Sequence, residues 1–244
     1  INATEPYLAL LMEEHVIDIK GVDVAFFRSN RAKRLNITIK PFKGVRVSVP
    51  VSVSFKKAKQ ETEERISWIK SLLSEDLFTV FNLDTKFQTR NHHLEIKVSD
   101  TDTLKSVLRN NKIAITIPQS NNIEDGEVQT EIRKAIERAW RKEAKEYLPE
   151  RVKALAEKHK FKYKNVAIKN TKTRWGSCSF ENNINLSLHL MRLPNHLIDY
   201  VILHELVHTK IKNHSRDFWQ LLEIVSGNAK KLAREVKKYR IQIY

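Results

Sequence analysis

The sequence predicts an α+β protein in which a β-rich N-terminal part precedes a part that combines helices with short strands. Two patterns predict this class. Between residues 16 and 117, apolar and polar residues alternate with a period of two, which is typical of half-buried strands. Beyond residue 126, apolar residues recur at helical spacing over long stretches. With 244 residues, 41% of them hydrophobic, the chain can bury a substantial core.

The N-terminal strands are predicted from this alternation, and Gly21 is expected to join the first two as a hairpin. One helix, residues 54–74, is predicted between two groups of strands because its apolar residues fall on one helical stripe. The predicted strands are residues 16–19, 22–26, 35–39, 45–49, 94–98 and 113–117. We find no internal repeat in the sequence.

A polar, turn-rich segment at residues 119–126 is the candidate boundary between two subdomains. It divides the chain into a β-rich N-terminal subdomain, residues 1–122, and a second subdomain, residues 123–244. The second begins with a predicted helix over residues 128–158, which Pro149 is expected to kink or interrupt.

Shorter elements follow this helix. Strands are predicted at residues 166–169, 174–179 and 184–190, and a strongly apolar helix begins near Asn195. Residues 215–239 are expected to be helical, with a break near Gly227 and Asn228. His189 falls on the polar face of its predicted strand and is therefore expected at the surface.

The net charge of +15 is compatible with binding to nucleic acid, to a membrane surface or to a polyphosphate. However, the basic residues are dispersed along the chain and interleaved with acidic ones, which is typical of a solvated surface. Nucleic acid is therefore a partner that the charge allows but does not favour.

Membrane and secretory signals are not found. No apolar run reaches the ~18 to 20 residues that span a bilayer, so no membrane partner is expected. Residues 1–6 lack the basic and apolar regions of a secretory signal. Cys178 is the single cysteine, which excludes an intramolecular disulfide and fits a reducing compartment. A cytoplasmic location is expected.

The apolar helix contains the motif His204-Glu205-Leu206-Val207-His208. Histidines four residues apart lie on one helix face, so both imidazoles can reach one ion. Glu205 lies beside them, where a carboxylate can act on water without being a ligand. Burying these groups in an apolar helix costs several kcal/mol unless they are paired or bind a metal. The alternative is that the histidines donate to backbone carbonyls and Glu205 pairs with a lysine.

Catalytic zinc takes three protein ligands, so a third is expected from beyond the helix. His214 is the candidate, because residues 210–213 before it can end the helix and Asn213 tolerates a left-handed C-terminal conformation. Asp217 and Glu223 in the next predicted helix are weaker alternatives, because carboxylates also bind zinc. The prediction is one Zn²⁺ per chain, bound by His204, His208 and His214.

Several further segments form a recognisable set with the histidine motif, namely Arg174–Ser179, Ile184–Leu186, Ile198–Val201, Asn213–Ser215, Phe218–Trp219, and upstream Arg28–Arg34, Val45–Pro50 and Trp68–Ile69. Together these segments resemble the YgjP-like metallohydrolases, which are relatives of the WLM and SprT-type zincins. The resemblance spans about residues 20–235 as one unit.

This resemblance implies a zincin-like metal-binding part with the three histidines as ligands and Glu205 as base. It also favours a role for Arg174, Trp175 and Gly176 in binding substrate along a cleft. The alternative is a purely structural role, in which Trp175 anchors the core and Gly176 allows a close backbone approach. Phe218 and Trp219 are expected to pack against the turn that carries His214, and Cys178 is expected to be a small buried residue.

Three functions follow, in decreasing order of expectation. The first is a metallopeptidase in which Glu205 takes a proton from the attacking water. The second is a nucleoside triphosphate (UTP) pyrophosphatase that uses the same site. Basic residues near the motifs favour such a phosphorylated substrate, namely Lys172, Arg174, Lys210, Lys212 and Arg216. The third is a nucleic-acid-associated zinc protein.

Overall fold

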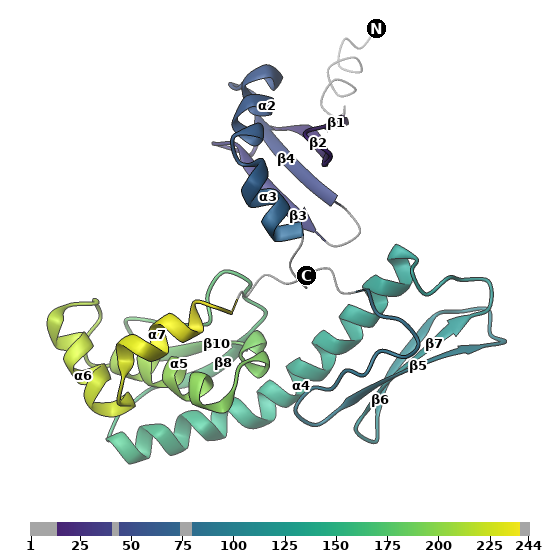
Figure 1. Ribbon diagram of the computed structural model, residues 1–244. Helices are drawn as coiled ribbons and strands as arrows, with labels where there is room; N and C mark the ends of the chain where they lie inside the picture. The colour runs from purple at the N-terminus through teal and green to yellow at the C-terminus, as the bar shows by residue number, and fades with distance from the viewer. Residues whose placement is uncertain (1–13, 41–43, 74–79, 240–244) are drawn as a thin grey trace, which may run out of the picture. The chain divides into compact units, whose positions relative to one another are not determined.

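The computed structural model describes residues 14–40, 44–73 and 80–239. Residues 1–6 and Ser74, at the end of a predicted helix, lie outside this part. The chain forms two compact units, unit 1 up to residue 79 and unit 2 from residue 80. Sheets dominate the N-terminal half and helices the C-terminal half, which confirms the predicted α+β class (Figure 1).

Unit 1 is a four-stranded sheet with two helices packed on it. Its strands run in the order β1-β2-β4-β3. Lys20 and Gly21 both have positive φ and close the predicted β1–β2 hairpin. The elements are β1 (Glu14–Asp18), β2 (Asp23–Ser29), β3 (Asn36–Lys40), β4 (Gly44–Pro50), α2 (Phe55–Glu63) and α3 (Ile66–Leu73).

The single helix predicted after β4 is therefore wrong, since a turn at Glu64 and Arg65 divides it. Ala58 on α2 and Ile66 and Ile69 on α3 all enter the same core. Because one core receives both helices, the apolar stripe in the sequence continues across the turn and hides it.

Unit 2 contains two three-stranded sheets joined by a long helix. The strand orders are β5-β7-β6 and β8-β10-β9. Its elements are β5 (His93–Ser99), β6 (Lys105–Arg109), β7 (Lys112–Pro118), α4 (Gly126–His159), β8 (Asn165–Lys169), β9 (Gly176–Cys178), β10 (Asn183–Ser187), the 3-10 helix η2 (Leu188–Arg192), α5 (Asn195–Val207), α6 (Arg216–Ser226) and α7 (Ala229–Val236).

The division into units differs from the subdomain junction predicted at residue 122. Strands β6 and β7 contact α4, so the sheet that precedes the polar segment belongs with the helix that follows it. The segment itself is a tight connection, in which Asp125 and Asn122 hydrogen-bond across the turn. Helix α4 is also longer than predicted and continues through Pro149 without interruption.

Strand β6 was not predicted, because three of its five residues are exposed and its apolar content is low. The last predicted strand was too long. The chain leaves β10 at Ser187 and turns into η2, so the alternation that places His189 at the surface stops before that residue. His189 is 1% exposed and its ring lies 6.1 Å from that of Trp140, so the surface prediction is wrong.

The two N-terminal sheets share one topology that the sequence does not reveal. β2 pairs with β4 as β5 pairs with β7, in parallel, and both registers end on a serine opposite a proline, Ser29 with Pro50 and Ser99 with Pro118. A third strand pairs antiparallel with β4 and with β7, and a helix follows each motif. β4 and β7 even have the same burial pattern. Because the buried positions require only apolar character, the duplicated structure leaves little sequence identity.

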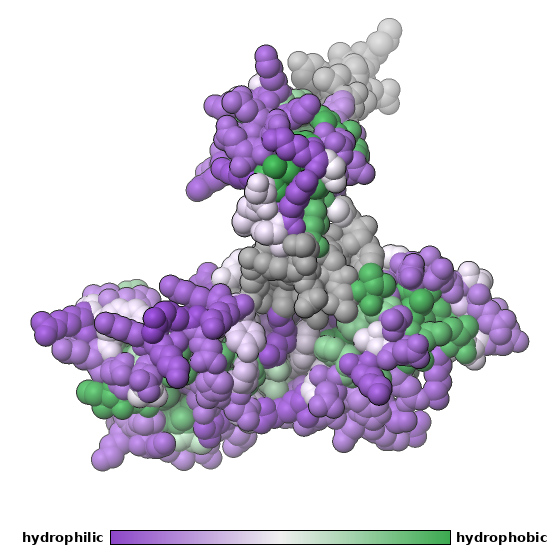
Figure 2. Space-filling model, viewed as in Figure 1, coloured by the Kyte–Doolittle hydropathy of each residue, from purple (hydrophilic) through white to green (hydrophobic). Residues whose placement is uncertain are grey.

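Hydrophilic side chains cover most of the face seen in Figure 2, with hydrophobic ones gathered over the part of unit 2 that holds β5–β7. Among the described residues, no helix combines the length and the apolar content needed to cross a membrane.

Candidate metal centre

Helix α5 carries the histidine motif through the middle of unit 2. It contacts α4, α6, α7, β9 and β10, which explains why it is apolar on nearly every side. Arg151 of α4 forms a two-pronged ion pair with Asp199 of α5, with both nitrogen–oxygen distances at 2.6 Å. The helix that carries the histidine motif is therefore held in place on several sides.

The structure brings the three predicted ligands together. His204 and His214 place their Nε2 atoms 3.1 Å apart, and one ligand atom from each of the three histidines lies within 4.8 Å of the others. The ring centroid of His208 lies 5.0 Å from that of His204 and 4.7 Å from that of His214. Such spacing suits three nitrogens around one cation, since zinc–nitrogen bonds are about 2.0–2.1 Å long.

Phe218 closes this cluster from the side of α6. Its ring centroid lies 4.9, 4.5 and 4.7 Å from those of His204, His208 and His214, and the side chain is fully buried. Ser215 caps α6 by accepting the backbone N–H of Phe218. The predicted packing role of Phe218 is thus seen, and Trp219 adds a looser contact at 6.1 Å from His214.

The turn between His208 and His214 is fixed by two contacts. The Nδ1 of His208 donates to the carbonyl of Ile211 at 3.0 Å, which leaves the Nε2 of the neutral ring with a free lone pair. Lys212 donates to the Ser179 carbonyl at 2.7 Å and to the Asn182 side chain at 2.6 Å. The second contact ties the turn that leads to His214 to the β9–β10 turn.

Asn213 does not adopt the left-handed conformation that the sequence allows there, since it is not among the residues with positive φ. The helix ends earlier, with Val207 as its last residue and His208 as its C-cap. Asn213 instead accepts the backbone N–H of Ser215 at 3.3 Å and so supports the start of α6.

Burial shapes the titration of the cluster. It lowers the pKa of His204 to about 3, and the charges of His208 and His214 add to this effect. Burial also lowers the pKa of His208. Both shifts favour the neutral imidazole, which is the form that binds metal. Burial raises the pKa of Glu205 to about 8, an effect that the positive charge of Arg174 opposes.

Gly176 is the point at which β9 meets Glu205. A Cβ atom at this position would lie 2.7 Å from Cγ and 2.8 Å from Oε1 of Glu205. Only a glycine leaves room for the carboxylate there. Gly176 and Cys178 face α5, in register with the buried Leu186 and Ile184 of β10, while Ser177 faces the opposite side.

The residues present fit a divalent cation. Three imidazole nitrogens from one helix and the following turn match the ligand set of catalytic zinc sites. In the part of the chain that the structure describes, the cluster of possible ligands contains no carboxylate. Glu223, one of the two weaker alternatives, accepts the backbone N–H groups of Asn228 and Ala229 at 2.8 Å and so caps α7, and Asp217 also lies outside the cluster.

The predicted substrate residues lie along the start of β9. Arg174 is exposed, the Trp175 carbonyl accepts the N–H of Ser187 at 2.8 Å, and Gly176 begins the strand. Because β9 has β10 on one side only, its other edge borders no strand among the described residues. Cys178 is partly buried, and burial raises its pKa.

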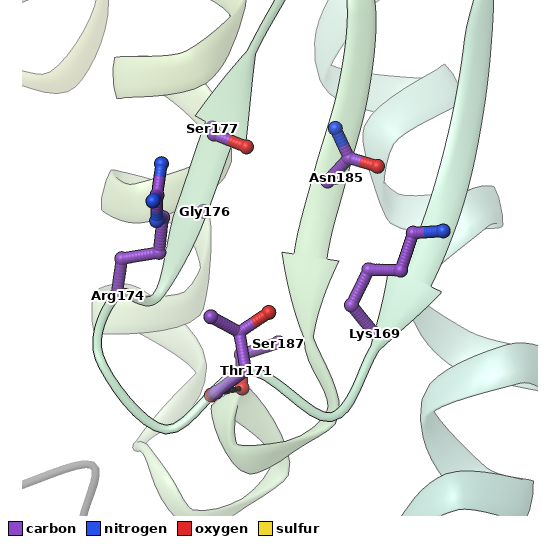
Figure 3. A pocket seen from close by; sticks show the side chains of 7 residues that line it. All are labelled: Lys169, Thr171, Arg174, Gly176, Ser177, Asn185 and Ser187. Carbon is purple, nitrogen blue, oxygen red and sulfur yellow. Dashed lines mark hydrogen bonds between the residues drawn. The ribbon is translucent and has the colours of Figure 1, made fainter. Parts of the chain in front are cut away.

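Sequence reasoning missed a pocket of about 200 Å³ on the face of this sheet that carries Ser177 (Figure 3). The pairing of β10 with both neighbours brings its residues together, a signal that the separate strands could not give. The lining residues are Lys169, Thr171, Arg174, Gly176, Ser177, Asn185 and Ser187.

Comparison with known proteins gives one family. The family model described as YgjP-like, metallopeptidase domain, matches residues 33–239. No curated protein matches the chain. Among solved structures, the metallopeptidase zymogen abylysin of Pyrococcus abyssi is 24% identical, with a TM-score of 0.34 over 37% of this chain and 91% of that one. The metallopeptidase zymogen jannalysin of Methanocaldococcus jannaschii is 27% identical, with a TM-score of 0.33 over 37% of this chain and 93% of that one.

Proposed function

The chain belongs to the YgjP-like family, metallopeptidase domain, and we propose that it is a zinc-dependent peptidase of the HExxH type. Family membership supports a metal-dependent hydrolase and implies a divalent metal. The proposal adds the ion, one Zn²⁺ per chain, its ligands His204, His208 and His214, and Glu205 as the base.

One observation carries the proposal. The three imidazoles have ligand atoms within 4.8 Å of one another, and the helix that carries two of them also carries a 6% exposed carboxylate at Glu205. Burying such a group is costly unless it is paired, hydrogen-bonded or close to a metal ion. Among the described residues, Glu205 makes no ion pair or hydrogen bond, so its burial is unexplained by structure alone.

The residues of the chain divide the work as follows. The three histidines hold the cation, which when bound acts as a Lewis acid on water and on the scissile carbonyl and favours the charged form of a nearby carboxylate. The Glu205 carboxylate takes the proton of the attacking water and returns it to the leaving nitrogen. Gly176 gives this carboxylate the space it occupies, and Phe218 keeps the imidazoles packed.

A peptide is the favoured substrate because β9 offers a free edge beside Glu205. An extended peptide can pair with such an edge through its backbone, which positions it with little dependence on sequence. By contrast, several cations that would favour a nucleotide are engaged elsewhere. Lys212 binds the β9–β10 turn, Lys172 lies 4.0 Å from Glu137, and Lys210 lies over the ring of Phe161.

The test is a zinc-loaded activity screen of casein-like peptides against nucleoside triphosphates, with metal content measured on the same samples. We expect peptide cleavage by the wild type. Glu205→Gln should retain zinc and lose turnover, because the amide cannot accept the proton, whereas His204→Ala should lose both.

Glu150→Gln, an equivalent change at an exposed position on α4, is the matched control and should behave as the wild type. Full activity in the Glu205→Gln variant would remove this residue from the mechanism. Nucleotide hydrolysis without peptide cleavage would favour the pyrophosphatase, and zinc without any turnover, together with salt-sensitive binding of DNA or RNA, would favour the nucleic-acid-associated protein.

A further inference from the structure

The pocket on the β8-β10-β9 sheet has a lining suited to anions. Its walls are formed by two cations, hydroxyl and amide side chains and one glycine, with no carboxylate and no large apolar side chain. Figure 3 shows Ser177 on β9, Asn185 on β10 and Lys169 on β8, with the helices behind the sheet. We call the face that carries Ser177 and Asn185 the outer face, since Gly176 on the same strand faces α5.

The two cations are uncompensated. In the part of the chain that the structure describes, neither Lys169 nor Arg174 makes an ion pair or a hydrogen bond. Nearby lysines differ in this respect, since Lys164 pairs with Glu181 at 3.1 Å and Lys172 lies 4.0 Å from Glu137. Positive charge is therefore left available at the pocket and not around it.

Neutral donors complete the site. Ser177 and Asn185 are directly opposite each other in the β9–β10 register, and neither side chain has a hydrogen-bond partner among the described residues. Ser187, by contrast, is already used, because its hydroxyl donates to the Thr171 carbonyl at 2.7 Å. A carboxylate can accept from the guanidinium in two-pronged fashion and from these neutral donors at the same time.

The pocket is connected to the reaction through β9. A peptide paired with the free edge of β9 would lie about 4.8 Å from it, and its side chains would alternate between the two faces of the sheet. Those on one face point toward α5 and Glu205. Those on the outer face point toward Ser177. Every second side chain of the peptide therefore comes within reach of the pocket, which Arg174 also lines.

We propose that this pocket is a specificity subsite that binds an acidic side chain of the substrate, Glu or Asp, at one position of the bound peptide. The inference rests on the proposed peptidase function and adds the class of substrate. Arg174 provides the main contact, and Lys169, Ser177 and Asn185 complete the anion site from the neighbouring strands.

The test compares short fluorogenic peptides that carry Glu, Gln or Lys at each position in turn around the scissile bond, cleaved by the zinc-loaded full chain. The wild type should cleave the Glu peptide with a kcat/KM about 10- to 100-fold above that of the Gln peptide at one position, which corresponds to one or two charged hydrogen bonds. The Lys peptide should be the poorest at that position, and added salt should reduce the difference.

Arg174→Gln combined with Lys169→Gln should remove the preference for Glu, while Arg174→Lys should keep part of it. Lys145→Gln, an equal loss of charge at an exposed position on α4, should leave the preference unchanged. Zinc content and circular dichroism identify any variant that fails to fold, and the conservative Arg174→Lys variant then provides the comparison.

Cleavage of the Gln peptide that depends on Glu205, with no preference for Glu at any position, would overturn the subsite and leave the peptidase standing. A preference that persists in the doubly substituted variant would also overturn it. If no peptide is cleaved, or if only nucleoside triphosphates are hydrolysed, the peptidase fails and the subsite fails with it.

Discussion

Gly176→Ala is expected to damage catalysis while leaving the metal ligands in place. The added Cβ would lie 2.7 Å from Cγ, 2.8 Å from Oε1 and 3.0 Å from Cδ of Glu205, whereas ordinary contacts between such atoms begin near 3.4 Å. The carboxylate or the strand must therefore move by roughly 0.7 Å or more, and a displacement near 1 Å from productive geometry can cost about 100-fold in rate. We expect kcat to fall by about that factor.

The effect on folding should be smaller. Gly176 has no positive φ, so alanine can adopt its backbone conformation, and the atoms that it meets belong to a side chain that can rotate. Overpacking of this kind costs about 1–3 kcal/mol. Zinc content should stay at one ion per chain, because the three atoms nearest to the new methyl group all belong to Glu205 and not to a histidine.

The assay is steady-state peptide cleavage with metal analysis and denaturant unfolding on the same preparation. A double-mutant cycle provides the control. If the methyl group acts through Glu205, then Gly176→Ala should cost much less in a Glu205→Gln background than in the wild type. Equal losses in both backgrounds, loss of zinc, or wild-type kcat in the single variant would each refute the reasoning.

Two further predictions concern buried polar groups away from the metal centre. Burial lowers the pKa of His189 to about 4, with Arg192, Lys172 and Arg141 adding to the effect and Glu137 opposing it. The folded state binds the His189 proton less tightly than the unfolded state does. The protein is therefore at full stability above pH 6.5, where the ring is neutral in both states, and loses stability as the pH falls toward 4. About 3 kcal/mol should therefore disappear over that window, and denaturant titrations should show a weaker pH dependence in His189→Leu; an identical dependence would contradict this. Glu143 is fully buried and accepts the N–H of Asn91 at 2.8 Å and His92 Nδ1 at 2.7 Å. Glu143→Gln should lower the free energy of unfolding by about 2–4 kcal/mol. A loss no larger than that of the exposed Glu150→Gln would show that the hydrogen bonds of Glu143 contribute little to stability.

The sequence predicts the grouping of the three histidines better than it predicts the bounds of the helices and strands. His204 and His208 are brought together by helical periodicity alone, which needs no tertiary information. His214 follows His208 after a short turn, so its ring has to lie near the other two histidines. The position of Gly176 against Glu205 could not be predicted in this way, because it depends on how β9 packs on α5 and not on spacing along the chain.

The errors in the predicted fold have a common physical cause. Hydrophobic periodicity indicates which residues are buried but not where the chain turns. The α2–α3 turn is hidden because both helices enter one core, and His189 is buried because η2 replaces the end of a strand whose alternation continues in the sequence. The duplicated β2–β4 and β5–β7 motifs are hidden for the related reason that buried positions fix only apolar character.

The same argument explains why the pocket could be found only in the structure. Taken one at a time, Lys169, Ser177 and Asn185 are ordinary polar residues that the sequence alone would place in solvent. Only the central place of β10 sets Asn185 opposite Ser177 and Ser187 opposite Lys169, so that their polar side chains share one face. Gly176, next to Ser177 on β9, packs against Glu205, so charge on this face lies within one strand of the proposed base. In the proposed peptidase, substrate selection and proton transfer would be coupled through β9, and substitutions there should alter both.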